Sequence, residues 1–125
     1  MNLIEIFTIL IVHWISDFCL QTDKMAKGKS NNMFDLLDHT VTYSVLWIIP
    51  IWLLFKYNDG TCITSHNVPI FIGITFIFHT ITDFITSRIN SRLWKEGKIH
   101  GFFISIGFDQ LLHYSQLFIT YQLLK

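Results

Sequence analysis

Four long runs of apolar residues, each interrupted by a few polar positions, dominate the pattern of this chain. They cover about residues 2–20, 34–55, 68–91 and 100–124. A helix needs roughly 20 mostly apolar residues to cross a hydrocarbon core of about 30 Å. The pattern therefore predicts an all-α fold, a four-transmembrane-helix bundle that makes residues 1–125 a single integral membrane domain.

The polar positions inside these runs repeat between the two halves of the chain. Each half contains the pattern His-x-Ile-Ser/Thr-Asp-Phe followed by Phe-Asp-x-x-x-His, at 13–18 and 34–39 and again at 79–84 and 108–113. This repeat predicts two tandem, pseudo-symmetric helical hairpins, with halves at about 1–62 and 63–125. Because each half has an even number of helices, the predicted pseudo-symmetry axis runs along the membrane normal.

The repeated histidines and aspartates are candidate metal ligands. Each pair is four residues apart, so both side chains lie on one helix face, one turn apart. Imidazole and carboxylate together suit divalent transition metals. The ligand count predicts two ions, zinc first, with manganese or iron as alternatives. The predicted ligands are His13, Asp17, Asp35, His39, His79, Asp83, Asp109 and His113.

An alternative explanation exists for any single pair, because a histidine and an aspartate one turn apart can simply hydrogen-bond. Asp35 has a further one, since a carboxylate in the first turn of a helix is favoured by the helix dipole. For the whole set, a carboxylate at the membrane centre costs roughly 2.5–3.5 kcal/mol on insertion scales. Four uncompensated aspartates would cost on the order of 10 kcal/mol, so the pattern favours bound cations.

Composition and charge place the chain in a membrane. It is 51% hydrophobic and 16% aromatic with a formal net charge of zero, which gives no indication of a nucleic-acid partner. Basic residues concentrate in the first and third connections, so these are predicted to be cytoplasmic and both termini extracytoplasmic. All eight predicted ligands then lie in the cytoplasmic half of a multi-pass protein. The basic residues are Lys24, Lys27, Lys29, Arg88, Arg92, Lys95 and Lys98.

Three further polar residues are candidates for contact with a substrate. Arg88 and Arg92 are one turn apart beside the third run, and guanidinium groups match phosphate oxygens well. Positive-inside topology explains the same two arginines equally well. Gln21 extends the face of His13 and Asp17 by one turn and is a candidate to hold a ligand or a substrate oxygen.

A resemblance supports these positions. The blocks at 13–21, 79–94 and 107–114 resemble a family of small integral membrane proteins of bacteriophages and bacteria, and more loosely bacterial inner-membrane proteins described as metal-dependent hydrolases. The resemblance implies location in a bacterial, or host, inner membrane. It also adds Gln110 as a candidate substrate-binding residue. The motif positions that carry over are His13, Asp17, Gln21, His39, His79, Asp83, Arg88, Asp109, Gln110 and His113.

Together these observations predict a membrane-embedded, metal-dependent hydrolase that acts on a phosphoester at the cytoplasmic side. A phospholipid or another phosphorylated molecule is the expected substrate, with Asp17, Asp83 and Arg88 as catalytic residues. One alternative is a phage protein that binds or inhibits a host membrane protein and uses metal only structurally, and a homo-oligomer is also compatible. A second alternative is a divalent cation or proton transporter, because intramembrane ionisable groups often line such routes.

Overall fold

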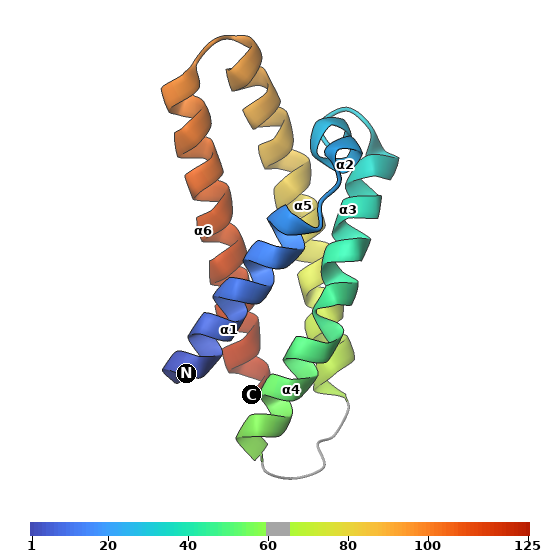
Figure 1. Cartoon of the computed structure of the whole chain (residues 1–125), viewed down its shortest axis with the longest axis vertical. Coiled ribbons are helices and arrows are strands. Elements are labelled where there is room, and N and C mark those ends of the chain that lie inside the picture. Colours follow the sequence, from blue (N-terminus) through green and yellow to red (C-terminus); the bar gives the residue numbers. More distant parts are fainter. Residues whose placement is uncertain (60–65) are drawn as a thin grey trace.

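The computed structural model of the chain describes residues 1–59 and 66–125 (Figure 1). These residues form helices and no strand, which confirms the all-α prediction. The boundary predicted between the two halves lies outside the described residues, and the repeat itself stays a prediction. The helices are α1 (Leu3–Trp14), the π-helical turn η1 (Ile15–Cys19), α2 (Asp23–Gly28), α3 (Met33–Leu46), α4 (Ile48–Asp59), α5 (Asn67–Lys95) and α6 (Ile99–Leu124).

The prediction of four membrane-spanning helices is confirmed only in part. Two segments of the described chain are long and apolar enough to cross a membrane, Met33–Tyr57 and α5. The first predicted helix is short, with 12 residues in α1 and five in η1. The last, α6, has 26 residues but carries several polar side chains, including Asp109 and Gln110. The first predicted helix is therefore short for a membrane span. The fourth is long enough, but its polar residues lower its hydropathy.

Local chemistry explains where the helices end and bend. Asn2 and Glu5 form a reciprocal capping box at the start of α1. Pro50 has no N–H for the carbonyl of Leu46, and the break between α3 and α4 falls there. Gly97, with φ 68°, ends α5, while the N–H of Lys98 donates to the Leu93 carbonyl at 2.9 Å. This Schellman-type turn reverses the chain into α6.

The helices pack as an elongated bundle in which α5 and α6 form one long hairpin and α3 packs against α5 (Figure 1). The two basic connections lie at one end of the bundle, which we call the basic end, and both termini lie at the other. The half nearer the termini has an apolar and aromatic core. That core contains Ile9, Tyr43, Trp47, Ile51, Leu54, Phe55, Phe71, Leu117 and Tyr121.

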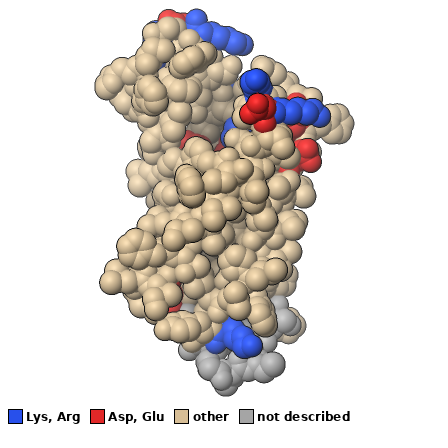
Figure 2. Space-filling model, in the orientation of Figure 1, with Lys and Arg blue, Asp and Glu red and all other residues tan. Residues whose placement is uncertain are grey.

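The outer surface is largely apolar. Large hydrophobic side chains are exposed on every long helix, among them Phe34 at 80%, Ile49 at 68% and Leu123 at 78%. On the face shown in Figure 2, charged side chains gather toward the two ends and leave a broad uncharged middle. Such extensive exposed apolar surface marks a face that contacts lipid or protein.

Candidate metal centre

Six of the eight predicted ligands meet inside the bundle, in the half nearer the basic end. All six are buried, with at most 8% of any residue exposed. They come from η1, α3, α5 and α6, so four separate helical elements converge on one place. We call this set the His/Asp cluster, and it contains Asp17, His39, His79, Asp83, Asp109 and His113.

Four of these side chains point one ligand atom each at a common centre. His39 Nε2 lies 3.1 Å from Asp17 Oδ1 and 3.2 Å from Asp83 Oδ2. His79 Nε2 lies 3.2 Å from His39 Nε2, 3.6 Å from Asp17 Oδ1 and 3.9 Å from Asp83 Oδ2. Ligand atoms about 2.0 Å from a tetrahedral zinc ion are about 3.3 Å apart. The four atoms therefore have the spacing of a four-coordinate site.

A second group of three ligands shares one aspartate with the first. Ligand atoms of Asp17, Asp109 and His113 lie within 4.8 Å of one another. His113 Nε2 is 3.4 Å from Asp109 Oδ1 and 3.1 Å from Asp83 Oδ1, so it also connects the two groups. Asp17 is the one residue common to both groups, which is the position of a carboxylate that can bridge two ions.

Polar neighbours fix the orientation of the carboxylates. The Gln110 amide nitrogen donates to Asp17 Oδ2 at 3.2 Å and to Asp109 Oδ2 at 3.0 Å. Thr86 donates its hydroxyl to Asp109 Oδ1 at 2.6 Å. Such outer hydrogen bonds hold metal ligands in place. Gln110, expected from the sequence to bind substrate, thus contacts the cluster itself, and Thr86 was missed although it lies one turn after Asp83.

His13 lies beside the cluster and outside both ligand groups. Its Nδ1 is 2.7 Å from the Tyr43 hydroxyl and its Nε2 is 2.8 Å from Gln110 Oε1, so both ring nitrogens have protein partners. Tyr43 also stacks on His79, with ring centroids 3.7 Å apart and planes at 3°. Tyr43 follows His39 by four residues, and this continuation of the helix face is the signal that could have identified it.

Asp35 lies apart from the cluster. It is in the first turn of α3, one turn closer to the basic end than His39, and its Oδ1 is 3.4 Å from Lys24 Nζ. A Cβ atom added at Gly28 would collide with the Asp35 carboxylate, so α2 packs closely against this side chain. The structure therefore places Asp35 where it joins α2 to α3, and gives it no contact with the other predicted ligands.

Lys29 is a third residue of the centre, after Thr86 and Tyr43, that sequence reasoning missed. Its Nζ donates to Asp83 Oδ2 at 2.8 Å, and only 20% of its side chain is exposed. Burial alone would lower the pKa of the Lys29 ammonium, but the charges of Asp83 and Asp17 outweigh burial and raise that pKa. Nothing in the spacing of the sequence separates Lys29 from Lys24 and Lys27, because all three lie in one short connection.

A cavity of about 460 Å³ connects the cluster to the basic end. Asp17, Asp109 and Gln110 lie at its cluster side, and Lys27, Lys29 and Lys95 are among its other lining residues. Gln21 lines it too, although the helix ends at Cys19 and Gln21 does not continue the helical face as predicted. Figure 2 shows acidic atoms in a hollow of the upper half, seen from the side of the bundle.

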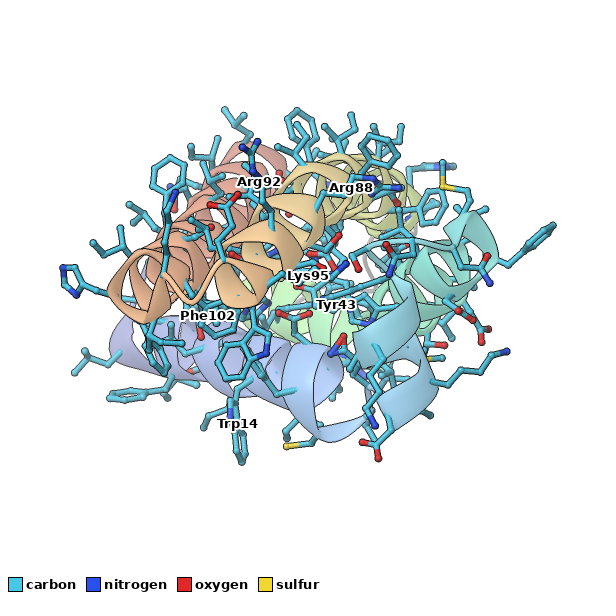
Figure 3. All side chains as sticks on the ribbon, turned by 90° about the horizontal axis from the view of Figure 1, so that it is seen from above. Trp14, Tyr43, Arg88, Arg92, Lys95 and Phe102 are labelled. Carbon is cyan, nitrogen blue, oxygen red and sulfur yellow. The ribbon has the colours of Figure 1, made fainter. Side chains whose placement is uncertain are left out.

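Arg88 and Arg92 lie on the outer side of α5, away from the bundle interior (Figure 3), and do not line this cavity. Arg88 donates to the Phe84 carbonyl at 2.6 Å and lies over the Phe84 ring. Arg92 donates to Glu96 at 2.8 Å, and with Lys98 it lowers the pKa of Glu96 to about 2. The two guanidinium groups are therefore engaged by α5 and its turn.

The charge of the cluster suits divalent cations. Three buried aspartates face the Lys29 ammonium and three imidazoles, which bind an ion in their neutral form. Buried carboxylates need a compensating positive charge, and hard or borderline divalent ions bind oxygen and imidazole nitrogen together. The residues present therefore fit one closed site of four ligands and one site of three ligands beside the cavity.

Fold and centre together define a class, a small helical bundle with a buried His/Asp cluster under a basic cavity. The chain belongs to the family described as "Protein of unknown function (DUF3307)", whose model matches residues 6–125. No curated protein and no solved structure matches the chain. The comparisons thus give no support to the expected similarity to metal-dependent hydrolases.

Proposed function

We propose that this protein is a membrane-embedded, metal-dependent hydrolase that acts on a phosphoester at the cytoplasmic side of a bacterial inner membrane. The observation that carries the proposal is the His/Asp cluster beside a cavity edged with lysines. Metal ligands alone suit many roles, whereas ligands next to a cationic cavity suit chemistry on an anion. We take zinc as the first candidate, with manganese or iron as alternatives, because all three accept mixed nitrogen and oxygen ligands.

The membrane arrangement that we propose has four spans with the basic end in the cytoplasm. The 26 residues of α6 extend about 39 Å at 1.5 Å per residue, enough to cross the hydrocarbon core despite their polar positions. Those polar positions, among them Asp109, Gln110 and His113, point into the bundle and not into lipid. The shorter α1 and η1 can be accommodated by local thinning of the bilayer.

Two ions are proposed, with different tasks. Four protein ligands close a site and are typical of structural metal, while three ligands leave a position open for water or substrate. The closed site would be held by Asp17, His39, His79 and Asp83, and the open one by Asp17, Asp109 and His113. A divalent cation in the open site would supply Lewis acidity to a phosphoryl oxygen and lower the pKa of a water.

The protein groups around the cavity would then carry the remaining steps. Lys29 and Lys95 would bind non-bridging phosphoryl oxygens, a role that the sequence assigned to Arg88 and Arg92. A water oxygen would bond to phosphorus while Asp109 accepts its proton, and the ester oxygen would leave with the P–O electron pair and take that proton from Asp109. Asp83, which contacts Lys29, would hold that ammonium toward the phosphate.

A purely structural metal in a binding protein remains the second candidate. The closed four-ligand geometry favours it, because those ligands join η1, α3 and α5 and would hold short helices together. The transporter alternative is weaker, because the aromatic core around Trp47, Phe71 and Tyr121 fills the bundle on the other side of the cluster.

The test is hydrolysis of a phosphoester panel by purified, metal-loaded protein and by two matched variants. Asp109→Asn removes one ligand of the open site, and Asp38→Asn makes the same change at an exposed position outside it. We expect Asp109→Asn to lose turnover by at least about 100-fold while it keeps the closed-site ion, and Asp38→Asn to match the parent. A parent that binds metal and turns over none of the phosphoesters would leave the structural role in its place.

A further inference from the structure

The cavity beside the His/Asp cluster has two chemically different walls. Along α5 it is lined by the polar residues Ser87, Ser91 and Lys95, each one turn after the last, and by Asn90 beside Ser91. Along α6 it is lined by Ile106 and Phe102, one turn apart, above Asp109 and Gln110. A ligand that fills this space must therefore be polar on one side and apolar on the other.

The apolar wall continues across the top of the hairpin. The rings of Trp94 and Phe102 lie 5.1 Å apart, and both line the cavity. Phe18 of η1 lines it from the opposite side and is 47% exposed. The same cavity is lined by Lys27, Lys29 and Lys95, so apolar and cationic surface meet in it.

Two buried amide oxygens point to a ligand with hydrogen-bond donors. Gln21 Oε1 and Asn90 Oδ1 are buried without a hydrogen-bond partner among the described residues, and both side chains line the cavity. An unpaired buried polar atom costs roughly 1–3 kcal/mol, so native structures usually satisfy it. Hydroxyl groups next to a phosphate, as in a glycerol or sugar headgroup, would do so.

The opening is also on the side of the bundle. Figure 2 looks across the long axis, and acidic atoms are visible in the hollow of its upper half. With the basic end at headgroup level, such an opening faces the region of the membrane where lipid phosphates lie. A phosphate could enter sideways while its chain stays in contact with apolar surface.

We propose that the cavity binds a phosphorylated amphiphile, with the phosphate against the cluster and the lysines and the chain over Phe102 and Ile106. This inference rests on the proposed function for the membrane position of the cavity and names the substrate class of the same site. A lipid and a soluble metabolite can both carry a phosphate monoester, and the cluster and lysines would bind either one. The apolar wall of Phe102 and Ile106 would select the lipid, because only the lipid has a chain to bury there.

The experiment measures equilibrium binding to zinc-loaded, full-length protein in nanodiscs of phosphatidylcholine, with empty nanodiscs subtracted. The probes are dodecyl phosphate, which has a head and a chain, and methyl phosphate, which has only the head. We expect dodecyl phosphate to bind at least about tenfold more tightly than methyl phosphate. A tenfold gain in affinity needs the burial of only a few methylene groups.

Two pairs of variants separate the cavity from simple partition into the bilayer. Ile106→Asn changes the apolar wall, and Ile104→Asn makes the same change at an exposed position of α6 outside the cavity. We expect Ile106→Asn to weaken dodecyl phosphate about tenfold, with methyl phosphate unaffected, and Ile104→Asn to bind as the parent does. Equal binding of the two probes by the parent, or equal effects of the two isoleucine variants, would overturn the inference.

The second pair tests the headgroup. Lys27→Ala with Lys95→Ala removes two cations from the cavity, while Lys24→Ala with Lys98→Ala removes two from the same end outside it. We expect the first pair to weaken both probes at least about tenfold and the second pair to change neither, and equal effects would contradict the proposal. Tight, chain-dependent binding without any hydrolysis would refute the hydrolase and leave this binding site standing.

Discussion

Two buried acidic sites in this bundle are compensated in opposite ways. Near the termini, Glu5 is fully buried and receives the Asn2 N–H at 2.7 Å, the Tyr121 hydroxyl at 3.0 Å and Lys125 Nζ at 2.7 Å. In the His/Asp cluster, three aspartates face imidazoles and the single ammonium of Lys29. The Glu5 carboxylate is therefore surrounded by donors from its own chain, whereas the three cluster carboxylates share one ammonium and face imidazoles whose ring nitrogens converge with them.

This difference separates a structural polar site from a site built for a ligand. A buried carboxylate is tolerated where donors and counter-charges surround it, as they surround Glu5. Ligand atoms of His39 and His79 instead point at the same centre as two carboxylate oxygens, with five separations of 3.1–3.9 Å. One cation between these atoms would be within reach of all four of them. The cluster should therefore depend on metal and the Glu5 site should not.

The largest expected effect comes from Asp17→Asn, because Asp17 is the ligand common to both groups. We expect this variant to lose both ions, while Glu5→Gln keeps them. Metal content of the purified proteins, measured by elemental analysis, tests the pair. An Asp17→Asn protein with its full metal content would show that the cluster does not hold the ions.

The next effect separates the two histidines that the sequence repeat makes equivalent. His79→Ala should lose at least the ion of the closed site, because His79 Nε2 is one of its four ligand atoms. His13→Ala should keep its metal and lose the hydrogen bonds with Tyr43 and Gln110 together with the ring contact with Tyr114, a cost of about 1–3 kcal/mol in stability. Similar metal loss in both variants would mean that His13 moves into the site when the ions bind.

A smaller effect is expected at the site near the termini. Glu5→Gln removes the buried charge and leaves Lys125 without its partner, and breaking a buried ion pair costs about 3–5 kcal/mol. We expect a lower Tm in detergent by an amount that is the same with and without zinc. If zinc restored the Tm of Glu5→Gln, the claim that the Glu5 site is independent of metal would be contradicted.

The smallest effects come from the two lysines, and here the dependence on metal matters more than the size. Lys125→Met should lower Tm equally in metal-free and metal-loaded protein, because Glu5 then loses the ammonium at 2.7 Å in both. Lys29→Met should lower Tm mainly in the metal-free protein, since bound cations take over the charge that Lys29 provides to Asp83. Equal losses in both states for Lys29→Met would contradict this role.

Much of the centre follows from helical spacing, and the exceptions have physical causes. Four-residue spacing predicted that these residues share helix faces, and the structure brings six of the eight predicted ligands together, including both members of the pairs on α5 and α6. His13 differs from His79 because Gln110 and Tyr43 occupy its ring nitrogens, while the sequence repeat has Leu36 and Leu117 at the matching positions. Asp35 begins α3 and lies a turn away from His39, so shared spacing did not bring it to the cluster.

Features that depend on tertiary structure escaped the sequence. Lys29 reaches Asp83 from a connection 54 residues away along the chain, which no local pattern reveals. Arg88 and Arg92 have the spacing of a phosphate clamp but lie on the outer face of α5. The membrane spans were predictable in part. The helix α5 is apolar enough to be recognised as a span, whereas the polar residues that α6 contributes to the centre lower the mean hydropathy of that helix.

The most direct test of the account is the metal content of the parent protein after gentle purification without chelators. We predict about two transition-metal ions per chain, because the closed and open groups each supply a ligand set and share Asp17. Removal of those ions should lower Tm, and zinc should restore it. A content below about half an ion per chain, with no increase in Tm on adding zinc, would contradict the central claim that the His/Asp cluster is a metal centre.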